Sequence, residues 1–254
     1  MQSISRNLTV TADGFPLTGF RRARLTGRDT LGLCPMPFTL RLWNLSDSGY
    51  YLLAASKELS VSSGDAVLAS GAVSDVYRRM TPEGRITEVV FSPALSLWEA
   101  PVSLSLEAGA SVSETIRRIL EASGTGISLL SFPGSDPVRT RGQAFAGRAA
   151  ECVAEALSAA SARGCLTAAG LCVVPAEGLP VSMALTEADL TDEPVPAGGR
   201  LLTVKTRPIG WPLGKTVSIT WKGTAATGLV TERSIAADNM EGPWQAELLM
   251  EVKS

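Results

Sequence analysis

The sequence predicts an α+β fold that is mostly β, with barrel or sandwich segments at both ends and a small α+β unit inserted between them. Three observations support this prediction. Residues 214–252 alternate apolar and polar side chains with a period of two, which is typical of strands with one buried face. Residues 1–100 contain several short alternating runs at the spacing of barrels and sandwiches. The signals for helices are confined to residues 101–178.

Residues 1–100 form the first β-rich segment, and their clearest strand is Phe38–Trp43, which alternates cleanly after two prolines. The run Thr81–Gly84 (Thr-Pro-Glu-Gly) is typical of a hairpin turn. It predicts that residues 73–79 pair with residues 85–91. The remaining expected strands are Tyr50–Ala54 and Ala66–Val76.

Residues 101–178 read as a strand, a helix, a strand, a second helix and a hairpin. Ser111 and Glu114 form a capping box, in which each side chain accepts a hydrogen bond from a free amide of the first helical turn. Gly124 is a natural end for this helix. The other expected elements are a strand at Val102–Leu106, a strand at Ile127–Phe132, a helix from about Gly147 to Arg163 that Gly164 ends, and a hairpin of Cys165–Thr167 with Leu171–Val174.

Residues 179–254 complete or add a second β domain. They begin with a polar connection that runs to Arg200, and strand character returns at Leu201–Lys205. A three-stranded meander closes the chain, with Leu229–Ala236 as its middle strand. We expect this meander to share a sheet with the first segment, across the inserted unit. The tryptophans in phase with the apolar side of their strands, and therefore expected in the core, are Trp43, Trp221 and Trp244.

The composition is that of an ordinary soluble globular protein. Of the 254 residues, 45% are hydrophobic and 19% are charged, and the net charge is −2. This mildly acidic balance argues against a general DNA or membrane-surface binder. No apolar run is long enough to span a membrane, and the first residues do not form a secretory signal. We therefore expect synthesis in the cytoplasm and no membrane span.

The chain contains no histidine, which excludes a catalytic triad and a histidine general base. The four cysteines form no C-x-x-C pair, so the usual zinc sites are also disfavoured. Cys165 and Cys172 flank the expected hairpin turn, a placement that allows a disulfide. The alternative, favoured in a reducing compartment, is that all four are small buried side chains.

Carboxylates are the remaining candidates for catalysis. Glu114 with Glu121, or the acidic stretch 187–193, could support peptidoglycan hydrolysis. Capping, a solvated helix face and an exposed linker explain these residues equally well. The loop Trp211–Lys215 contains Gly-Lys but lacks the spacing of a phosphate-binding loop. We therefore predict no enzyme, and no catalytic, cofactor-binding or metal-binding residues.

Two groups of residues are candidates for interface anchors. Trp98 and Trp211 lie beside prolines in expected connections, where they could contact a partner protein or, alternatively, a carbohydrate or the cell wall. The basic residues Arg21, Arg22 and Arg24, with Arg28 close by, could contact phosphates or an acidic neighbouring subunit. The simpler interpretation of this basic cluster is a solvated strand edge.

Two stretches of the insert resemble a known family. They are VSETIRRILEASG (residues 112–124) and AAECVAEALSAASARGCLTAAGLCVV (residues 149–174). Together with the β-rich start and the closing meander, they resemble the baseplate hub proteins of contractile-tailed bacteriophages, to which the late control protein D group is related. The likeness covers most of the chain from about residue 15.

The resemblance implies a structural virion protein of the tail baseplate, made in the host cytoplasm. Such a hub joins the tail tube to the central spike and forms part of the DNA channel, so that DNA meets it only in passing. Its subunits supply two tube-type β domains each, and three chains imitate a six-fold ring. Residues 1–100 and 179–254 would be these domains or parts of them. The implied partners are further copies in a homotrimer, the tail tube, the spike and other baseplate proteins, without a cofactor.

Overall fold

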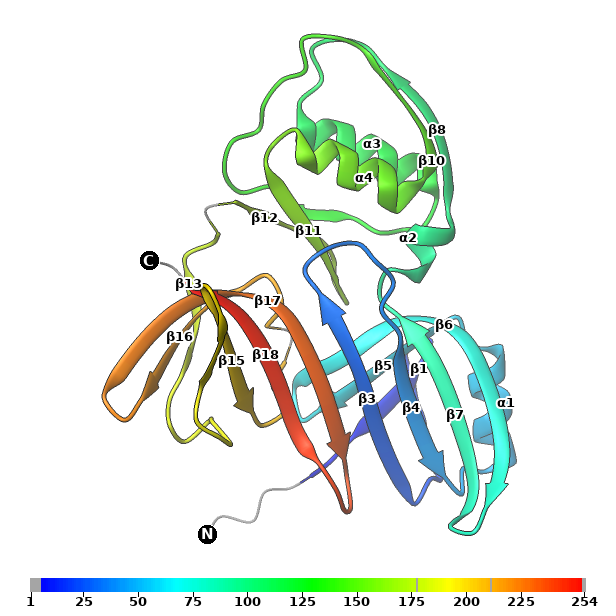
Figure 1. Cartoon of the computed structure of the whole chain (residues 1–254). Coiled ribbons are helices and arrows are strands. Elements are labelled where there is room, and N and C mark those ends of the chain that lie inside the picture. The colour runs from blue at the N-terminus through cyan, green and yellow to red at the C-terminus, as the bar shows by residue number, and fades with distance from the viewer. Residues whose placement is uncertain (1–5, 177, 211, 253–254) are drawn as a thin grey trace.

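The computed structural model describes residues 6–176, 178–210 and 212–252. It confirms a mostly β fold of the α+β class, with a helical insert lying against one end of a large sheet system (Figure 1). Within the described residues, no helix is long and apolar enough to cross a membrane.

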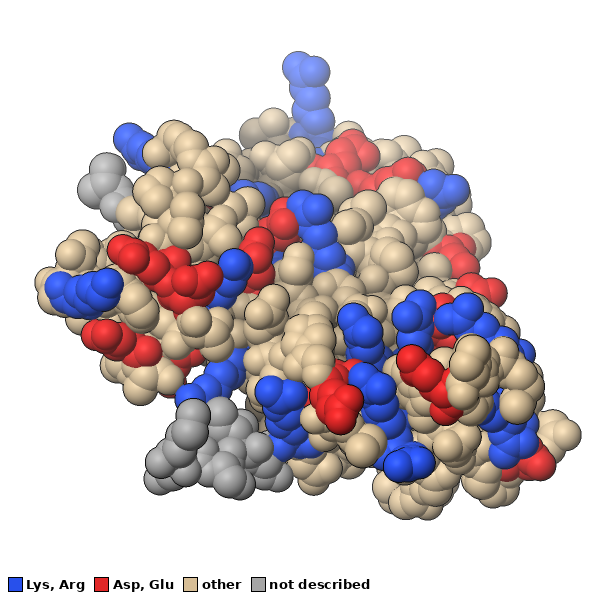
Figure 2. Space-filling view, turned by 60° about the horizontal axis from the view of Figure 1, so that its bottom comes forward, with Lys and Arg blue, Asp and Glu red and all other residues tan. Residues whose placement is uncertain are grey.

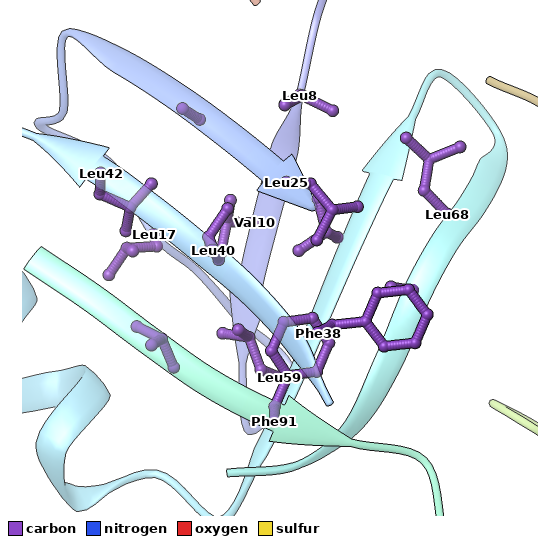
Figure 3. Close-up of a cluster of buried hydrophobic side chains, with 14 of the residues drawn as sticks. Leu8, Val10, Leu17, Leu25, Phe38, Leu40, Leu42, Leu59, Leu68 and Phe91 are labelled. Atoms are coloured by element: carbon purple, nitrogen blue, oxygen red, sulfur yellow. The ribbon is translucent and has the colours of Figure 1, made fainter. Parts of the chain in front are cut away.

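The first β-rich region is an antiparallel sheet that curls around its own core. Its strands lie in the order β3-β4-β7-β6-β5-β1-β2. Figure 3 shows leucines from several of these strands pointing at Phe38 and Phe91, whose ring centroids lie 5.7 Å apart. The predicted hairpin is present between β6 and β7. The bounds are β1 Thr9–Ala12, β2 Phe15–Pro16, β3 Arg22–Thr30, β4 Phe38–Trp43, β5 Glu58–Ser63, β6 Ala66–Thr81 and β7 Gly84–Ser92.

The strand expected at Tyr50–Ala54 is wrong, because this segment lies in helix α1 (Asp47–Ala55). The Ser46 hydroxyl accepts a hydrogen bond from the Gly49 amide at 3.1 Å and so starts the helix. The cap outweighs the strand preference of the two adjacent tyrosines. Tyr50 packs against the core, whereas Tyr51 is exposed.

The closing region contains the predicted meander, and its middle strand is longer than expected. Strand β17 has 15 residues, pairing with β16 through its first part and with β18 along most of its length.

The segment before Arg200, expected to be a polar connection, contains two strands, so that prediction is wrong. Both lie at edges of the sheet, and most of their side chains are exposed. Their sequences therefore lack the alternation of buried apolar and exposed polar residues that predicts a strand. The bounds are β13 Val181–Leu185, β14 Val195–Gly198, β15 Leu201–Thr206, β16 Thr216–Trp221, β17 Thr224–Asp238 and β18 Trp244–Val252.

Strand β17 joins the two β-rich regions. Its second half pairs with β3, from Glu232 opposite Thr30 to Asp238 opposite Arg24. The sheets at the two ends of the chain are therefore one continuous sheet of 13 strands within the described residues. This confirms that the closing meander pairs with the β-rich start. Of the tryptophans expected in the core, Trp221 and Trp244 pack partly buried against the apolar cores of the closing and first β-rich regions. The prediction for Trp43 is wrong, because Trp43 follows Leu42 and so points to the face of β4 opposite the core, where it is buried with the Arg22 guanidinium 4.7 Å from its ring centroid.

The insert has a separate apolar core between two small sheets and three helices, the first of which, Leu95–Glu99, precedes the expected start of the insert. The Ser111 hydroxyl accepts from the Glu114 amide, and Gly124 ends α3 with a left-handed φ of 64°, both as predicted. The second of the predicted helices ends earlier than expected, at Ser158, because the chain turns into strand β11, which includes Gly164. The bounds are α2 Leu95–Glu99, β8 Pro101–Leu106, α3 Val112–Ser123, β9 Leu129–Ser131, β10 Gln143–Arg148, α4 Ala149–Ser158, β11 Ala162–Thr167 and β12 Gly170–Pro175.

Candidate interaction surface

A row of polar side chains crosses five strands on the outer face of the continuous sheet. The register places these residues directly opposite one another in the order Asp238 on β17, Arg24 on β3, Arg41 on β4, Glu88 on β7 and Tyr77 on β6. The neighbouring residues in β3 and β4 are leucines and an alanine buried in the core. Since successive side chains of a strand point to opposite faces, the row lies on the outer face. We call these five residues the arginine row.

The acidic residues of the row are held by arginines. Asp238 accepts hydrogen bonds from Arg22 Nε at 3.0 Å and Arg22 Nη2 at 2.5 Å. Burial by itself would raise the pKa of Asp238, but Arg22 and the amides of Met240 and Glu241 lower it overall. The Asp238 carboxylate therefore stays ionised at neutral pH.

Glu88 accepts from two arginines and a tyrosine. Arg41 Nε lies 2.6 Å from Glu88 Oε2, Arg79 Nη2 lies 3.4 Å from the same oxygen, and the Tyr77 hydroxyl donates to Oε1. Burial acts to raise the pKa of Glu88, yet these partners keep it below its usual range. Bonding to Glu88 in turn raises the pKa of Tyr77. Glu88 is thus the anionic centre of this part of the surface.

Arg24 is the charge that this arrangement does not balance. It stands directly opposite Arg41, and like charges in such a pair are destabilising. Its Nε is buried without a hydrogen-bond partner, and within the described residues Arg24 forms no ion pair. A groove of about 330 Å³ lies here, and we call it the arginine groove. It is lined by Arg22, Arg24, Arg41, Trp43, Arg79, Thr81, Pro82, Glu83 and Ile86.

Figure 2 shows basic side chains gathered over the first β-rich region, with fewer acidic ones among them. The simpler interpretation of the predicted basic cluster as a strand edge is wrong, because β3 lies between β17 and β4. Arg22 and Arg24 contribute to the groove, whereas the exposed Arg28 pairs with Glu232. Arg21 is exposed just before β3.

Two contributors to the groove, Arg41 and Arg79, were not singled out from the sequence. The only signal for Arg41 is its polar position within the alternating run Phe38–Trp43. Which residue faces it depends on the pairing of strands that are far apart in the chain.

The candidate tryptophan anchors are not part of this surface. Trp98 lies in α2, packs partly buried against the core of the insert, and has the Arg148 guanidinium 5.0 Å from its ring centroid. This cover leaves little of the ring face for stacking on a sugar. Trp211 lies outside the described residues.

Three of the carboxylates considered for hydrolysis, Glu114, Asp189 and Asp192, have structural roles. Glu114 accepts from Arg118 at 2.8 Å, one helical turn later, instead of closing the expected capping box. Asp189 accepts from the amide and hydroxyl of Thr186, which lower its pKa, and the Glu193 amide and Lys205 lower that of Asp192. A general acid for glycoside cleavage needs a raised pKa, so these shifts have the wrong direction.

Comparisons with known proteins identify the fold. No family model matches the sequence, and no curated protein matches it in sequence. A tail protein from Neisseria meningitidis is 11% identical and superposes with a TM-score of 0.69, over 96% of this chain and 95% of that one. The chain has the fold of phage tail proteins.

Two further solved structures extend this likeness. The 43 kDa tail protein of prophage MuSo2 from Shewanella oneidensis is 10% identical, with a TM-score of 0.67 over 97% of this chain and 99% of that one. A component of the Escherichia coli type VI secretion system, described as similar to the T4 tail proteins gp27 and gp5, is also 10% identical. It has a TM-score of 0.66 over 96% of this chain and 77% of that one. The similarity therefore includes the insert and both β-rich regions.

Proposed function

We propose that this protein is a structural component of a phage tail, the baseplate hub that joins the tail tube to the central spike. The observation that carries the proposal is the likeness to tail proteins over nearly the full length of both chains. Fold alone does not fix function. Here, however, the resemblance of the insert sequence and the shared fold point to the same class of protein.

The proposed assembly is a homotrimeric ring around the DNA channel. Each subunit would contribute residues 1–100 and 179–254 as its two tube-type β domains, with residues 101–178 as the insert. The pairing of β17 with β3 supports this arrangement, because it fixes the two β-rich regions side by side in one sheet. The protein would be made in the host cytoplasm and would reside in the tail baseplate. Its partners would be further copies, the tail tube, the spike and other baseplate proteins.

The arginine groove is the proposed contact for an acidic side chain of the neighbouring copy. Residues 179–254 carry seven lysines and arginines against nine acidic residues, whereas residues 1–100 carry ten against nine. A contact between the two different regions would be head-to-tail, the type of interface that closes a ring. Glu83 in the groove and Glu88 beside it, bound to Arg41 and Arg79, interrupt the basic surface, which disfavours a continuous DNA backbone as the ligand. DNA would then meet the ring only in passing.

The proposal is tested by deleting the gene from a phage that carries it and complementing with an affinity-tagged copy. We expect particles with defective tails after deletion, and the tagged protein at the baseplate end of purified tails after complementation. Intact tails formed without the protein would contradict the proposal.

A further inference from the structure

Two free cysteines stand directly opposite each other in the hairpin of the insert. Cys165 on β11 and Cys172 on β12 are register partners, and both thiols are free. Facing residues of antiparallel strands have Cα atoms about 4.5–5.5 Å apart, within the range that a disulfide spans. A bond between the two sulfurs would therefore need little movement of the backbone.

The pair lies where the insert meets the closing β-rich region, at the position of β11 and β12 in Figure 1. Leu166 and Leu171 belong to the core of the insert, so the cysteines, one residue away on each strand, point to the other side. Cys165 Sγ lies 3.8 Å from the Leu213 carbonyl oxygen. A Cβ added at Gly214 would lie 3.1 Å from the same sulfur, so this loop packs closely on the pair.

The two thiols differ in access and in acidity. Cys165 is buried and Cys172 is half-buried. Interaction with the neighbouring Cys165 thiol, helped by Thr167 and by the positive charge of Lys215, lowers the pKa of Cys172 to about 6. The same interaction and burial raise the pKa of Cys165. At neutral pH, Cys172 is therefore the thiolate that a reagent in solution can reach.

We propose that Cys165 and Cys172 form a reversible disulfide, made by exchange with a small-molecule disulfide such as oxidised glutathione. The Cys172 thiolate attacks one glutathione sulfur, the S–S bond of glutathione breaks, and one glutathione thiolate leaves. Cys165 then loses its proton and attacks Cys172 Sγ, which releases the second glutathione thiolate. Two protein sulfurs are oxidised and one glutathione disulfide is reduced; the Cys165 proton passes to one leaving thiolate, and the other takes a proton from water.

This pair would stay reduced in a reducing cytoplasm and would close in oxidising solution. Closure would link the two strands that carry the contact between the hairpin and the Leu213–Gly214 loop. The inference rests on the hairpin alone and does not depend on the proposed function.

The test uses the Cys34→Ser variant, because Cys34 is an exposed thiol that would also react. Cys152 is kept as an internal control, since burial raises its pKa and protects it. The folded protein is incubated with oxidised glutathione at about pH 7, and non-reducing mass spectrometry follows the products. We expect a Cys165–Cys172 disulfide without bound glutathione, reversed by dithiothreitol.

Two further substitutions in this background separate the roles of the cysteines. Cys165→Ser should stop at the mixed disulfide, with one glutathione on Cys172. Cys172→Ser should leave Cys165 at least about tenfold less reactive, because that thiol is buried and protonated. Equal labelling of both single variants, or two free thiols after prolonged oxidation, would overturn the inference. Thermal unfolding before the reaction checks that each variant is folded, and Cys→Ala versions replace any serine variant that is not.

Discussion

Arg233 and Asp29 face each other across β17 and β3 and form a buried, two-pronged ion pair. Arg233 Nε lies 3.0 Å from Asp29 Oδ1, and Nη2 lies 2.9 Å from Oδ2. Burial raises the pKa of Asp29, and Arg233 opposes this shift. The pair sits where the two β-rich regions become one sheet, and neither partner can be removed without leaving a buried group uncompensated.

We expect Arg233→Met to lower the free energy of unfolding by about 3–5 kcal/mol, because it leaves the Asp29 carboxylate buried and unpaired. Adding Asp29→Asn should recover part of this loss. The control is Arg28→Met, which breaks an exposed pair with Glu232 in the same two strands and should cost less than about 1 kcal/mol. Urea unfolding measures all three variants. Equal losses for Arg233→Met and Arg28→Met would contradict the role given to the buried pair.

The ion pair of Asp238 with Arg22 should make stability depend on pH at the acid end. The folded state lowers the pKa of Asp238, so its stabilising effect is present at neutral pH and is lost as pH falls through the folded value, below about 4. We expect Asp238→Asn to lower the unfolding temperature at about pH 7, with a difference from the native protein that shrinks on acidification. Thermal melts between these pH values test this. A difference that does not change with pH would show that the charge is not responsible.

Gly71 in β6 is required by close contact between strands. A Cβ added there would lie 2.3 Å from the carbonyl carbon of Ser92, and backbone at this distance cannot yield as a side chain would. We expect Gly71→Ala to destabilise the protein by about 1–3 kcal/mol or more. Gly210→Ala is the matched control, because its nearest neighbour would be the Ala66 Cβ at an ordinary 3.6 Å. Similar melting temperatures for the two variants would refute this view of the β6 packing.

The elements predicted correctly from the sequence are those whose signals are local. Phe38–Trp43 alternates within six residues, and the cap at Ser111 lies within one helical turn of its partner. The prediction failed at Tyr50–Ala54, where a single serine cap decides between helix and strand. It also failed at β13 and β14, whose edge positions expose side chains that would be buried in an inner strand.

The candidate surface could be predicted only in part, because register decides it. Arg22 and Arg24 stand out in the sequence as a basic cluster. Asp238, which binds Arg22, lies 216 residues away, and only the pairing of β17 with β3 brings it into contact. The sequence therefore indicated that basic side chains lie on this surface, but not which of them form ion pairs with acidic residues.

Arg24→Glu separates a role in assembly from a role in folding. In the isolated subunit, this change removes a like-charge pair with Arg41 and creates one with Asp238, which stands opposite residue 24 on β17. The two effects oppose each other, so we expect little change in the melting temperature. In the proposed ring, it removes the contact for an acidic side chain and should weaken association at least about tenfold. Arg141→Glu, in an exposed loop of the insert, is the control and should have no effect on association. Unchanged association of Arg24→Glu at a given concentration would exclude the groove from the interface.

The mass of the native protein in solution tests the central claim most directly. A subunit of 26.6 kDa in a closed ring of three gives about 80 kDa. Light scattering across a range of concentrations should show this mass. The protein should also co-purify with assembled tails. A chain that stays at 26.6 kDa at every concentration and is absent from purified tails would contradict the account.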